Sequence, residues 1–493
     1  MVFSSLSFAV FFTVVCILMA LTNTKAVKAL AKGSLRRLRH MILLLASYFF
    51  YGYWNWKFCF LMLGLTAVSY LCARGCGGKR RGLCIKLGVI VPILILGIFK
   101  YYNFFVDSFC AVFGIQRLGT LKILLPVGIS FYTFQSLSYT IDVYRGKIEA
   151  ERSFADVALY IAFFPQLVAG PIVKAGDFIP QLHEDRNISL KGLEEGVQIF
   201  VFGLFKKLVI ADNIALLVDA VYANPAEFHA LTVVLAVAAY SMQIYCDFSG
   251  YSDMAIGIAL LLGFEFPKNF DNPYKSSSIT EFWRRWHISL SSWLKDYLYI
   301  SLGGNRHGKL RQYFNLLMTM LLGGLWHGAS LNFILWGGLH GLFLCVDKIW
   351  KSICPVLSPI SYLPRKGETP TPRPWHTYPI IFLGGLLTFH LVAACWVLFR
   401  APSFDIAQQV FDQILHKFQP QIFLQWCTSY KAVGILMLLG YLLHFLPSSL
   451  FDRLHRLITK LPLILQALLI VIVIYIVIQI KSSDVQPFIY FQF

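Results

Sequence analysis

Residues 461–480 read Leu-Pro-Leu-Ile-Leu-Gln-Ala-Leu-Leu-Ile-Val-Ile-Val-Ile-Tyr-Ile-Val-Ile-Gln-Ile and contain no charged side chain. A helix that crosses a bilayer needs about 20 mostly apolar residues, so this stretch is long enough to span. Because backbone groups cannot meet lipid unpaired, such runs must be helices, and the sequence predicts an all-α polytopic membrane protein. Other apolar runs of near-spanning length are Val2–Leu21, Ile85–Phe105, Leu193–Tyr222, Leu231–Cys246, Tyr378–Phe399 and Val433–Phe445.

The composition of the 493-residue chain indicates the same class of protein. Hydrophobic residues make up 57% of it and charged residues 14%, well below the charged share of soluble domains. The net charge of +18 could suit nucleic acid, but the basic residues cluster in short loops between apolar runs, as the positive-inside rule predicts. We therefore expect contact with membrane lipid and no nucleic-acid partner. The 11 cysteines include no Cys-x-x-Cys pair, so neither a metal site nor a disulfide framework is indicated.

The basic loops predict the orientation of the chain in the membrane. Lys25–Arg39 and Arg74–Lys86 carry basic residues and no acidic one, which places both loops in the cytoplasm and the N-terminus outside. Two cytoplasmic loops require an even number of crossings between them. Met41–Cys72 must then be a hairpin of two short helices, with Tyr53–Lys57 as its outer turn. Val2–Leu21 precedes basic residues rather than a cleavage site, so we expect a retained helix.

Two stretches differ from simple spanning helices. Phe154–Val173 contains Pro165 and the pair Gly170-Pro171, which break a helix. A broken apolar segment is tolerated where it is packed in protein or lines a cavity, so this one is either re-entrant or a kinked span. Pro355–Pro379 contains several prolines and basic residues and is predicted to be a loop. We expect residues 1–493 to form a single integral-membrane domain.

The segment Arg311–Gly341 contains a histidine deep in an apolar run. His327 lies 16 residues after Arg311, which corresponds to about 24 Å along a helix. That depth is inside a hydrocarbon core about 30 Å thick, where a histidine is costly and usually faces a cavity or pathway. The alternative is a buried histidine satisfied by a carbonyl. Gly324 and Gly328 beside it would admit a ligand or allow close helix packing.

The basic and aromatic stretch Lys268–Arg311 predicts amphipathic helices at the cytoplasmic interface. Within it, Glu281-Phe-Trp-Arg-Arg-Trp-His287 would place Arg284 and His287 on one helical face at i, i+3. Basic side chains here would suit an acidic carrier protein, the phosphates of coenzyme A or anionic lipid headgroups. His287 is therefore either part of a donor entrance or a solvated interfacial histidine.

Other polar residues in apolar surroundings have structural interpretations. Asp247 and Asp253 are six residues apart, about 120° from sharing a helical face, and would be a poor acid–base pair. We expect Ser252 or Asp253 to cap the helix that follows. His340 and His390 are predicted to make polar contacts between helices.

Several long motifs resemble a known family. Phe266-Pro-Lys-Asn-Phe-Asp-Asn-Pro-Tyr274, Phe282-Trp-Arg-Arg-Trp-His-Ile-Ser-Leu290 and Trp293-Leu-Lys-Asp-Tyr297 look like the signature of the membrane-bound O-acyltransferases. Ser301 and Leu331 depart from the pattern, where proline and tryptophan are expected. The resemblance covers nearly the whole chain, since four further motifs are similar to the alginate O-acetyltransferase branch of that family: Leu125–Gln135, Phe164–Ile172, Leu325–Ala329 and Pro487–Phe493.

The resemblance implies a bundle of about eleven spanning helices, with re-entrant segments and interfacial helices around a buried tunnel. It implies that residues 268–341 are the catalytic region, that His327 matches the family's essential histidine and that His287 matches its second one. It also implies a bacterial inner-membrane location, an acetylesterase-like partner outside the cytoplasm and, from a relative that transfers D-alanine to teichoic acid, a possible acyl carrier protein inside. The residues that we assign to substrate binding are Asn269, Arg284, Arg285, Trp286 and Asn332.

These residues predict an O-acyltransferase. A sugar hydroxyl is a weak nucleophile that needs a base poised near neutral pH, and histidine is the side chain whose pKa lies there. We expect His327 to take the hydroxyl proton beside a thioester donor, either acyl-coenzyme A or an acyl carrier protein; orienting the reactants alone is the alternative. His287 would orient or stabilise charge at the cytoplasmic mouth, and Asn332 is a candidate for stabilising the oxyanion. A thioester is already activated, so no metal or bound cofactor is expected.

The predicted reaction is transfer of an acyl group, with acetyl favoured, to a polysaccharide or envelope polymer outside the cytoplasm. A transporter or flippase would share the broken segments and intramembrane polar residues, but transporters usually show paired repeats, and the sequence has none. A non-catalytic scaffold of a polymer-secretion complex is the other alternative. Loss of acylation in a His327 variant that still assembles its partners would separate enzyme from scaffold.

Overall fold

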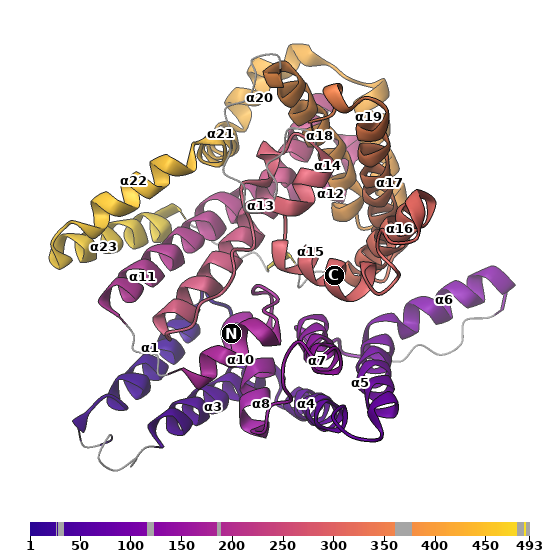
Figure 1. Ribbon diagram of the computed structural model, residues 1–493. Coiled ribbons are helices and arrows are strands. Elements are labelled where there is room, and N and C mark those ends of the chain that lie inside the picture. The colour runs from indigo at the N-terminus through magenta and orange to yellow at the C-terminus, as the bar shows by residue number, and fades with distance from the viewer. Residues whose placement is uncertain are drawn as a thin grey trace. The chain divides into compact units, whose positions relative to one another are not determined.

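The computed structural model describes residues 1–25, 27, 34–115, 123–184, 189–359, 377–480 and 488–489, and these residues form helices and no strand. The predicted all-α class is therefore confirmed for this part of the chain, whose helices are drawn in Figure 1. The chain divides into two compact units. Unit 1 contains Met1–Phe200 and Tyr251–Pro267, and unit 2 contains Val201–Gly250 and Lys268–Phe493. The expectation of a single functional domain stays a prediction.

Unit 1 begins with the predicted helical hairpin. The turn between α3 and α4 falls at Trp56, inside the predicted turn Tyr53–Lys57, so this hairpin is confirmed. Arg81–Phe113 then forms one long apolar helical stretch that contains a π-helical segment, η1. The elements of unit 1 are α1 (Leu6–Leu21), α3 (Leu35–Asn55), α4 (Lys57–Gly75), α5 (Arg81–Leu96), η1 (Gly97–Tyr101), α6 (Tyr102–Phe113), α7 (Ile129–Tyr144), α8 (Phe154–Ala162), α9 (Phe164–Leu167), α10 (Ala175–His183) and most of α11 (Leu190–Phe205).

The break predicted within Phe154–Val173 is confirmed. Helix α8 ends at Ala162, α9 is a single turn, and the chain is non-helical from 168 to 174. The whole segment from 157 to 173 is buried in unit 1, as non-helical backbone in an apolar protein must be. Gly128 packs against it in a left-handed conformation, with φ of 75°, and a Cβ there would lie 2.5 Å from the carbonyl oxygen of Leu167. Two of the family-like motifs therefore meet in unit 1.

The described residues contain six helices long and apolar enough to cross a membrane, and a seventh if the pair Pro420–Ser429 and Lys431–Phe445, bent by 99°, counts as one span. Helix α1 is apolar but shorter. The figure of about eleven spans stays a prediction. The six helices are Lys57–Gly75, Arg81–Phe113, Ala230–Leu261, Leu331–Ile353, Thr377–Arg400 and Leu463–Ile480. Most of the predicted loop Pro355–Pro379 lies outside the described residues, which resume with Thr377.

Unit 2 holds every candidate site residue. Its helical elements include η2 (Lys206–Ala211), α12 (Asp212–Ala223), η3 (Pro225–Glu227), much of α13 (Ala230–Leu261), η4 (Pro273–Lys275), α14 (Ile279–Arg285), α15 (Ile288–Trp293), η5 (Leu294–Tyr299), α16 (Gly308–His327), α17 (Leu331–Ile353), η6 (Pro355–Leu357), α18 (Thr377–Arg400), α19 (Phe404–His416), η8 (Pro420–Ile422), α20 (Phe423–Ser429), α21 (Lys431–Phe445), α22 (Ser448–Thr459) and α23 (Leu463–Ile480).

Helix α13 corrects the expectation of a helix cap near Ser252. The helix runs without a break for 32 residues, and Asp247–Asp253 lies in its interior. This stretch resembles a helix boundary because it is polar. In the structure Asp247 forms an ion pair with Lys207 of another segment and does not lie at a helix end. Gly250 lets that segment approach, since a Cβ there would lie 2.7 Å from the carbonyl oxygen of Gly203.

Helices α16 and α17 lie side by side as a hairpin (Figure 1). Ser330 begins α17, and its hydroxyl accepts a hydrogen bond from the Phe333 amide. A Cβ at Gly324 would lie 2.2 Å from the Phe333 carbonyl oxygen, and one at Gly337 would lie 2.3 Å from that of Met320. These glycines therefore serve close helix packing, which decides between the two interpretations of Gly324.

Candidate active site

The turn that carries His287 differs from the predicted helix. Helix α14 ends at Arg285, and His287 adopts a left-handed conformation with φ of 43°. Arg284 and His287 therefore do not share a helical face, and that expectation is wrong. His287 has no solvent exposure, so the alternative of a solvated interfacial histidine is wrong as well. A non-glycine residue held in this conformation needs support from its surroundings.

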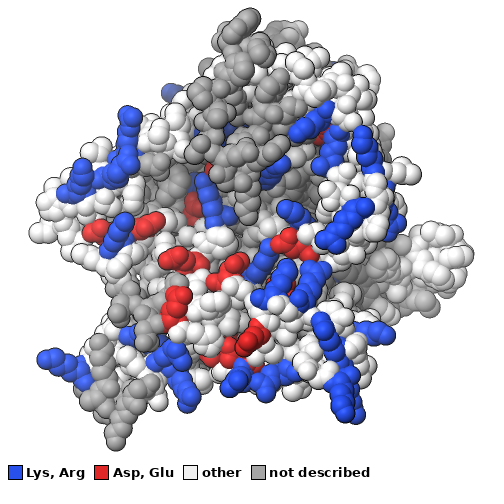
Figure 2. Space-filling view, in the orientation of Figure 1, with Lys and Arg blue, Asp and Glu red and all other residues white. Residues whose placement is uncertain are grey.

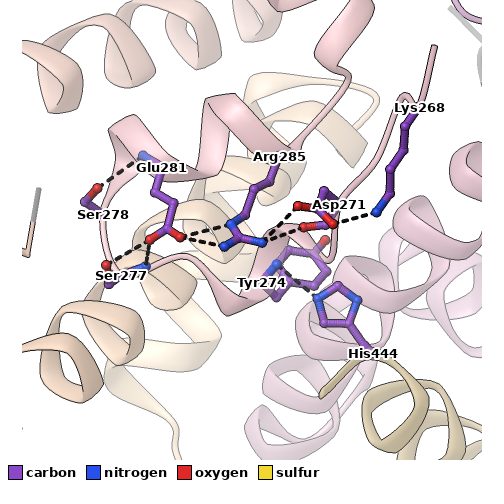
Figure 3. A network of polar contacts seen from close by, with 8 residues as sticks. All are labelled: Lys268, Asp271, Tyr274, Ser277, Ser278, Glu281, Arg285 and His444. Atoms are coloured by element: carbon purple, nitrogen blue, oxygen red, sulfur yellow. Dashed lines mark hydrogen bonds and ion pairs between the residues drawn. The ribbon is translucent and has the colours of Figure 1, made fainter. Parts of the chain in front are cut away.

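A chain of ion pairs supplies part of that support (Figure 3). Arg285 donates to the Glu281 carboxylate at 2.9 Å and to Asp271 Oδ2 at 3.2 Å. Lys268 donates to the other oxygen of Asp271 at 2.6 Å. Glu281 is fixed in turn, because the amide and the hydroxyl of Ser277 donate to it. Arg285, predicted to bind substrate, thus ties the segment before α14 to the turn after it.

Backbone bonds hold the same two segments together. The Asp271 amide donates to the Arg285 carbonyl at 2.9 Å, and the Ile288 amide donates to the Asn269 carbonyl at 2.8 Å. These bonds bring the Asn269 side chain, which is buried, beside the His287 ring. Asn269 was expected at a substrate surface, but here it contacts the catalytic candidate directly.

The hydrogen bonds of Asn269 define the tautomer of His287. Asn269 Oδ1 accepts from the Ser289 amide at 3.1 Å and from its hydroxyl at 2.8 Å, so this atom is an oxygen with acceptor character. His287 Nδ1 lies 3.1 Å from the same oxygen and must be the protonated nitrogen. Burial lowers the pKa of His287 to about 3, so the ring is neutral at physiological pH. Its Nε2 then presents a lone pair.

His327 lies at the last position of α16 and is 4% exposed, which confirms its predicted burial. Its ring lies 5.0 Å from that of Trp336 at an interplanar angle of 86°, and 5.1 Å from that of Phe399. The ring of Trp326 lies 4.9 Å away. The imidazole is therefore enclosed by aromatic rings from three helical segments, an environment that excludes water and strengthens electrostatic interactions.

Trp326 also connects the two candidate histidines. Its ring lies 6.2 Å from that of His287 and 4.9 Å from that of His327. The depth of about 24 Å estimated for His327 from Arg311 therefore does not separate it from His287 by that distance. The distance along α16 separates His327 from Arg311, not from His287. The chain after His287 folds back and packs against that helix. Leu294 shows this fold-back, since a Cβ at Gly323 would lie 3.2 Å from its side chain.

Two further buried histidines belong to the same aromatic cluster. His340 accepts a hydrogen bond from the indole of Trp283, so its predicted contact between helices is confirmed. His444 accepts one from the Tyr274 amide, as Figure 3 shows, and no feature of the sequence had singled it out. The corresponding prediction for His390 is wrong, because its ring bonds to the Leu386 carbonyl of its own helix.

The remaining predicted binding residues lie at different depths. Trp286 is 1% exposed and packs against Phe270 and Trp396, with ring distances of 5.1 and 4.9 Å. Arg284 is exposed, as are several basic residues between 268 and 311. Lys and Arg side chains are spread over the face drawn in Figure 2, with Asp and Glu among them. Asn332 is buried and donates to the carbonyl of Ala401.

A buried ion cluster lies next to Phe248, the residue of α13 that packs against His287. Lys207 lies 2.5 Å from Asp247 and 2.7 Å from Asp212, and all three side chains are almost fully buried. Asp247 also accepts a hydrogen bond from the Ile489 amide at 2.8 Å. The next residue of α13, Phe248, places its ring 4.6 Å from His287. This cluster joins segments far apart in the sequence, so no local pattern could have revealed it.

Comparison with known proteins identifies a family for this chain. The model of the MBOAT, membrane-bound O-acyltransferase family matches residues 150–361, which include both histidines. The chain is 44% identical over 388 residues to the probable alginate O-acetylase of Pseudomonas aeruginosa, covering 76% of this chain and 69% of the relative. It is 38% identical over 398 residues to the peptidoglycan O-acetyltransferase of Helicobacter pylori, covering 75% and 72%.

A more distant relative carries a different activity in its name. The teichoic acid D-alanyltransferase of Streptococcus thermophilus is 29% identical over 253 residues, covering 47% of this chain and 59% of the relative. The identity to the acetylases is far higher and extends over three quarters of the chain. From the motifs, the helical membrane fold and these similarities, the chain belongs to the membrane-bound O-acyltransferase family and is an O-acyltransferase.

Proposed function

We propose that this protein transfers an acetyl group from a cytoplasmic thioester to hydroxyl groups of a polysaccharide or envelope polymer outside the cytoplasm of a bacterium. The main support for the proposal is that His287 and His327 both contact the Trp326 ring, at 6.2 and 4.9 Å, in a buried aromatic site. The names of these two kinds of relative support the acceptor class, since alginate and peptidoglycan both present sugar hydroxyls.

In the proposed reaction, His327 removes the proton of the acceptor hydroxyl, and the hydroxyl oxygen bonds to the acyl carbon of the thioester. The tetrahedral intermediate collapses, the carbon–sulfur bond breaks, and the thiolate leaves and takes up a proton. General base catalysis of this kind contributes about 10²–10⁴-fold to a rate. The neutral His287, held by Asn269, presents the Nε2 lone pair to orient a donor group of one of the reactants.

The donor side of the proposal rests on charge. Several basic side chains between Lys268 and Arg311, including Arg284, are exposed, and we place that stretch in the cytoplasm by the positive-inside rule. They suit the phosphates of acetyl-coenzyme A or an acidic acyl carrier protein. No bound cofactor or metal takes part in the proposal. An acetylesterase-like protein outside the cytoplasm would deliver the group to the final polymer.

The test compares surface polysaccharide from cells with and without the gene by mass analysis. We expect O-acetyl groups in the polymer only when the protein is present. Unchanged acetylation in the cells without the gene would overturn the proposed function. A second arm supplies purified protein with acetyl-coenzyme A and the final polymer alone; transfer at the full cellular rate would show that the outer partner is unnecessary.

A further inference from the structure

Two buried N–H groups on α17, one of them in a ring that contacts His327, lack a hydrogen-bond acceptor. Trp336 and His340 lie one turn apart on α17, with ring centroids 4.8 Å apart, and their exposures are 1% and 0%. Within the described part of the chain, no acceptor reaches Trp336 Nε1 or His340 Nε2. They are two of the buried side-chain atoms of the described residues that have no partner, and they are adjacent, so a bound group with one acceptor could satisfy both.

The tautomer of His340 follows from its neighbour. Trp283 Nε1 lies 3.2 Å from His340 Nδ1, and an indole nitrogen can only donate. His340 Nδ1 must then present its lone pair, which makes the imidazole neutral and puts its one proton on Nε2. Trp336 Nε1 also carries a hydrogen and cannot accept. Both unsatisfied atoms are therefore donors, and both have a fixed protonation state.

The Trp336 donor lies next to the proposed base, and His340 lies beside Trp336. The Trp336 ring is 5.0 Å from His327, and Phe399 packs against both rings, at 5.3 and 5.1 Å. Preorganised donors in a water-excluded site are what acyl transfer needs where negative charge develops on the carbonyl oxygen. Asn332, the earlier candidate for this role, donates to the Ala401 carbonyl instead.

We propose that Trp336 Nε1–H and His340 Nε2–H stabilise the oxyanion that forms on the acyl group during transfer. As the acceptor hydroxyl loses its proton to His327 and bonds to the acyl carbon, the carbonyl electron pair moves onto oxygen and is held by the two donors. It returns when the carbon–sulfur bond breaks. Neither donor gives up its proton. This assignment rests on the proposed acetyl transfer and adds two residues to its machinery.

The experiment uses the purified full chain with acetyl-coenzyme A and alginate oligosaccharide, and follows thiol release and product mass. Trp336→Phe removes one donor and keeps a ring, and His340→Leu removes the other. Each should lower kcat about 10²–10³-fold, with KM for acetyl-coenzyme A within a few-fold of wild type. His340→Gln, which keeps an N–H near the Nε2 position, should recover part of the loss.

Trp396→Phe is the matched control for the loss of an indole from the same cluster. Its Nε1 already donates to the Tyr274 hydroxyl at 3.2 Å, and its ring lies 5.9 Å from that of Trp336. We expect a loss of less than tenfold in kcat. A loss equal to that of Trp336→Phe would show that ring packing, not the donor, accounts for the effect and would overturn the assignment.

A second measurement replaces the carbonyl oxygen of the donor with sulfur, using dithioacetyl-coenzyme A, because sulfur is a weak hydrogen-bond acceptor. The wild type should prefer the oxygen donor strongly, and this preference should shrink in Trp336→Phe and His340→Leu. An active wild type whose two variants keep its kcat and its oxygen preference overturns this assignment alone. A wild type that releases no thiol from acetyl-coenzyme A or from an acetylated acyl carrier protein, and adds no acetyl group even with the acetylesterase-like partner present, overturns the proposed function, and this assignment with it.

Discussion

The histidines of this protein differ in the residues that surround their rings. His327 is enclosed by Trp326, Trp336 and Phe399, whereas His390 is exposed and bonds within its own helix. We expect His327→Ala to lower acyl transfer at least 10²-fold, since it removes the base. His327→Gln, which keeps a polar side chain of similar size, should lose as much. His390→Ala should keep wild-type activity.

The measurement is product formation by purified variants, together with thermal unfolding. Variants of His327 that unfold near the wild-type temperature yet transfer nothing would support catalysis over structure. Retention of more than a few per cent of activity in either variant would remove His327 as the base. A variant that is inactive but still assembles its partners would also exclude a scaffold role.

At the scale of elements, the close packing of α16 against α17 positions both His327 and the donors of α17. We expect Gly324→Ala to destabilise the protein by about 1–3 kcal/mol or more, because the new Cβ would lie 2.2 Å from the Phe333 carbonyl oxygen, a backbone atom that cannot turn aside. Gly338→Ala is the control on the same hairpin, since its Cβ would meet only the movable Leu321 side chain, at 3.3 Å.

Thermal unfolding in detergent compares these two variants with the wild type. The midpoint should fall for Gly324→Ala and change little for Gly338→Ala, where the higher helix propensity of alanine offsets a small adjustment. Equal midpoints for both variants would mean that α16 and α17 can move apart without loss of stability. The close packing of these two helices would then be wrong.

At the scale of the whole molecule, the direction of transfer depends on which face meets the cytoplasm. We expect Asn305→Cys, in a chain whose 11 native cysteines are replaced, to react with an impermeant thiol reagent only after the inner face is opened. Trp56→Cys, at the turn between α3 and α4, should react on intact cells. Both positions are exposed, so access to reagent is set by the membrane. The reverse labelling pattern would contradict the direction of transfer.

From the sequence alone one could predict the all-α class, the hairpin α3–α4 and which histidines to consider as candidates. A membrane-spanning helix needs a continuous apolar run, so the hairpin α3–α4 and the break near Phe163 could be predicted from the local sequence. His327 and His287 were accessible because they lie in long motifs that resemble a family. The prediction of a helix boundary near Asp247 was wrong. Its partner Lys207 is 40 residues earlier in the chain, and a polar residue without a visible partner resembles a helix boundary.

Only the tertiary structure decided how these residues act together. In the structure both histidines contact Trp326, Asn269 bonds to His287, and the Trp336 ring of α17 lies against His327. It also replaced a presumed helical face by a left-handed turn at His287. The physical reason is that periodicity describes one helix at a time, whereas a tautomer, an ion pair or a ring contact is fixed by the segment that packs opposite, which here comes from a distant part of the sequence.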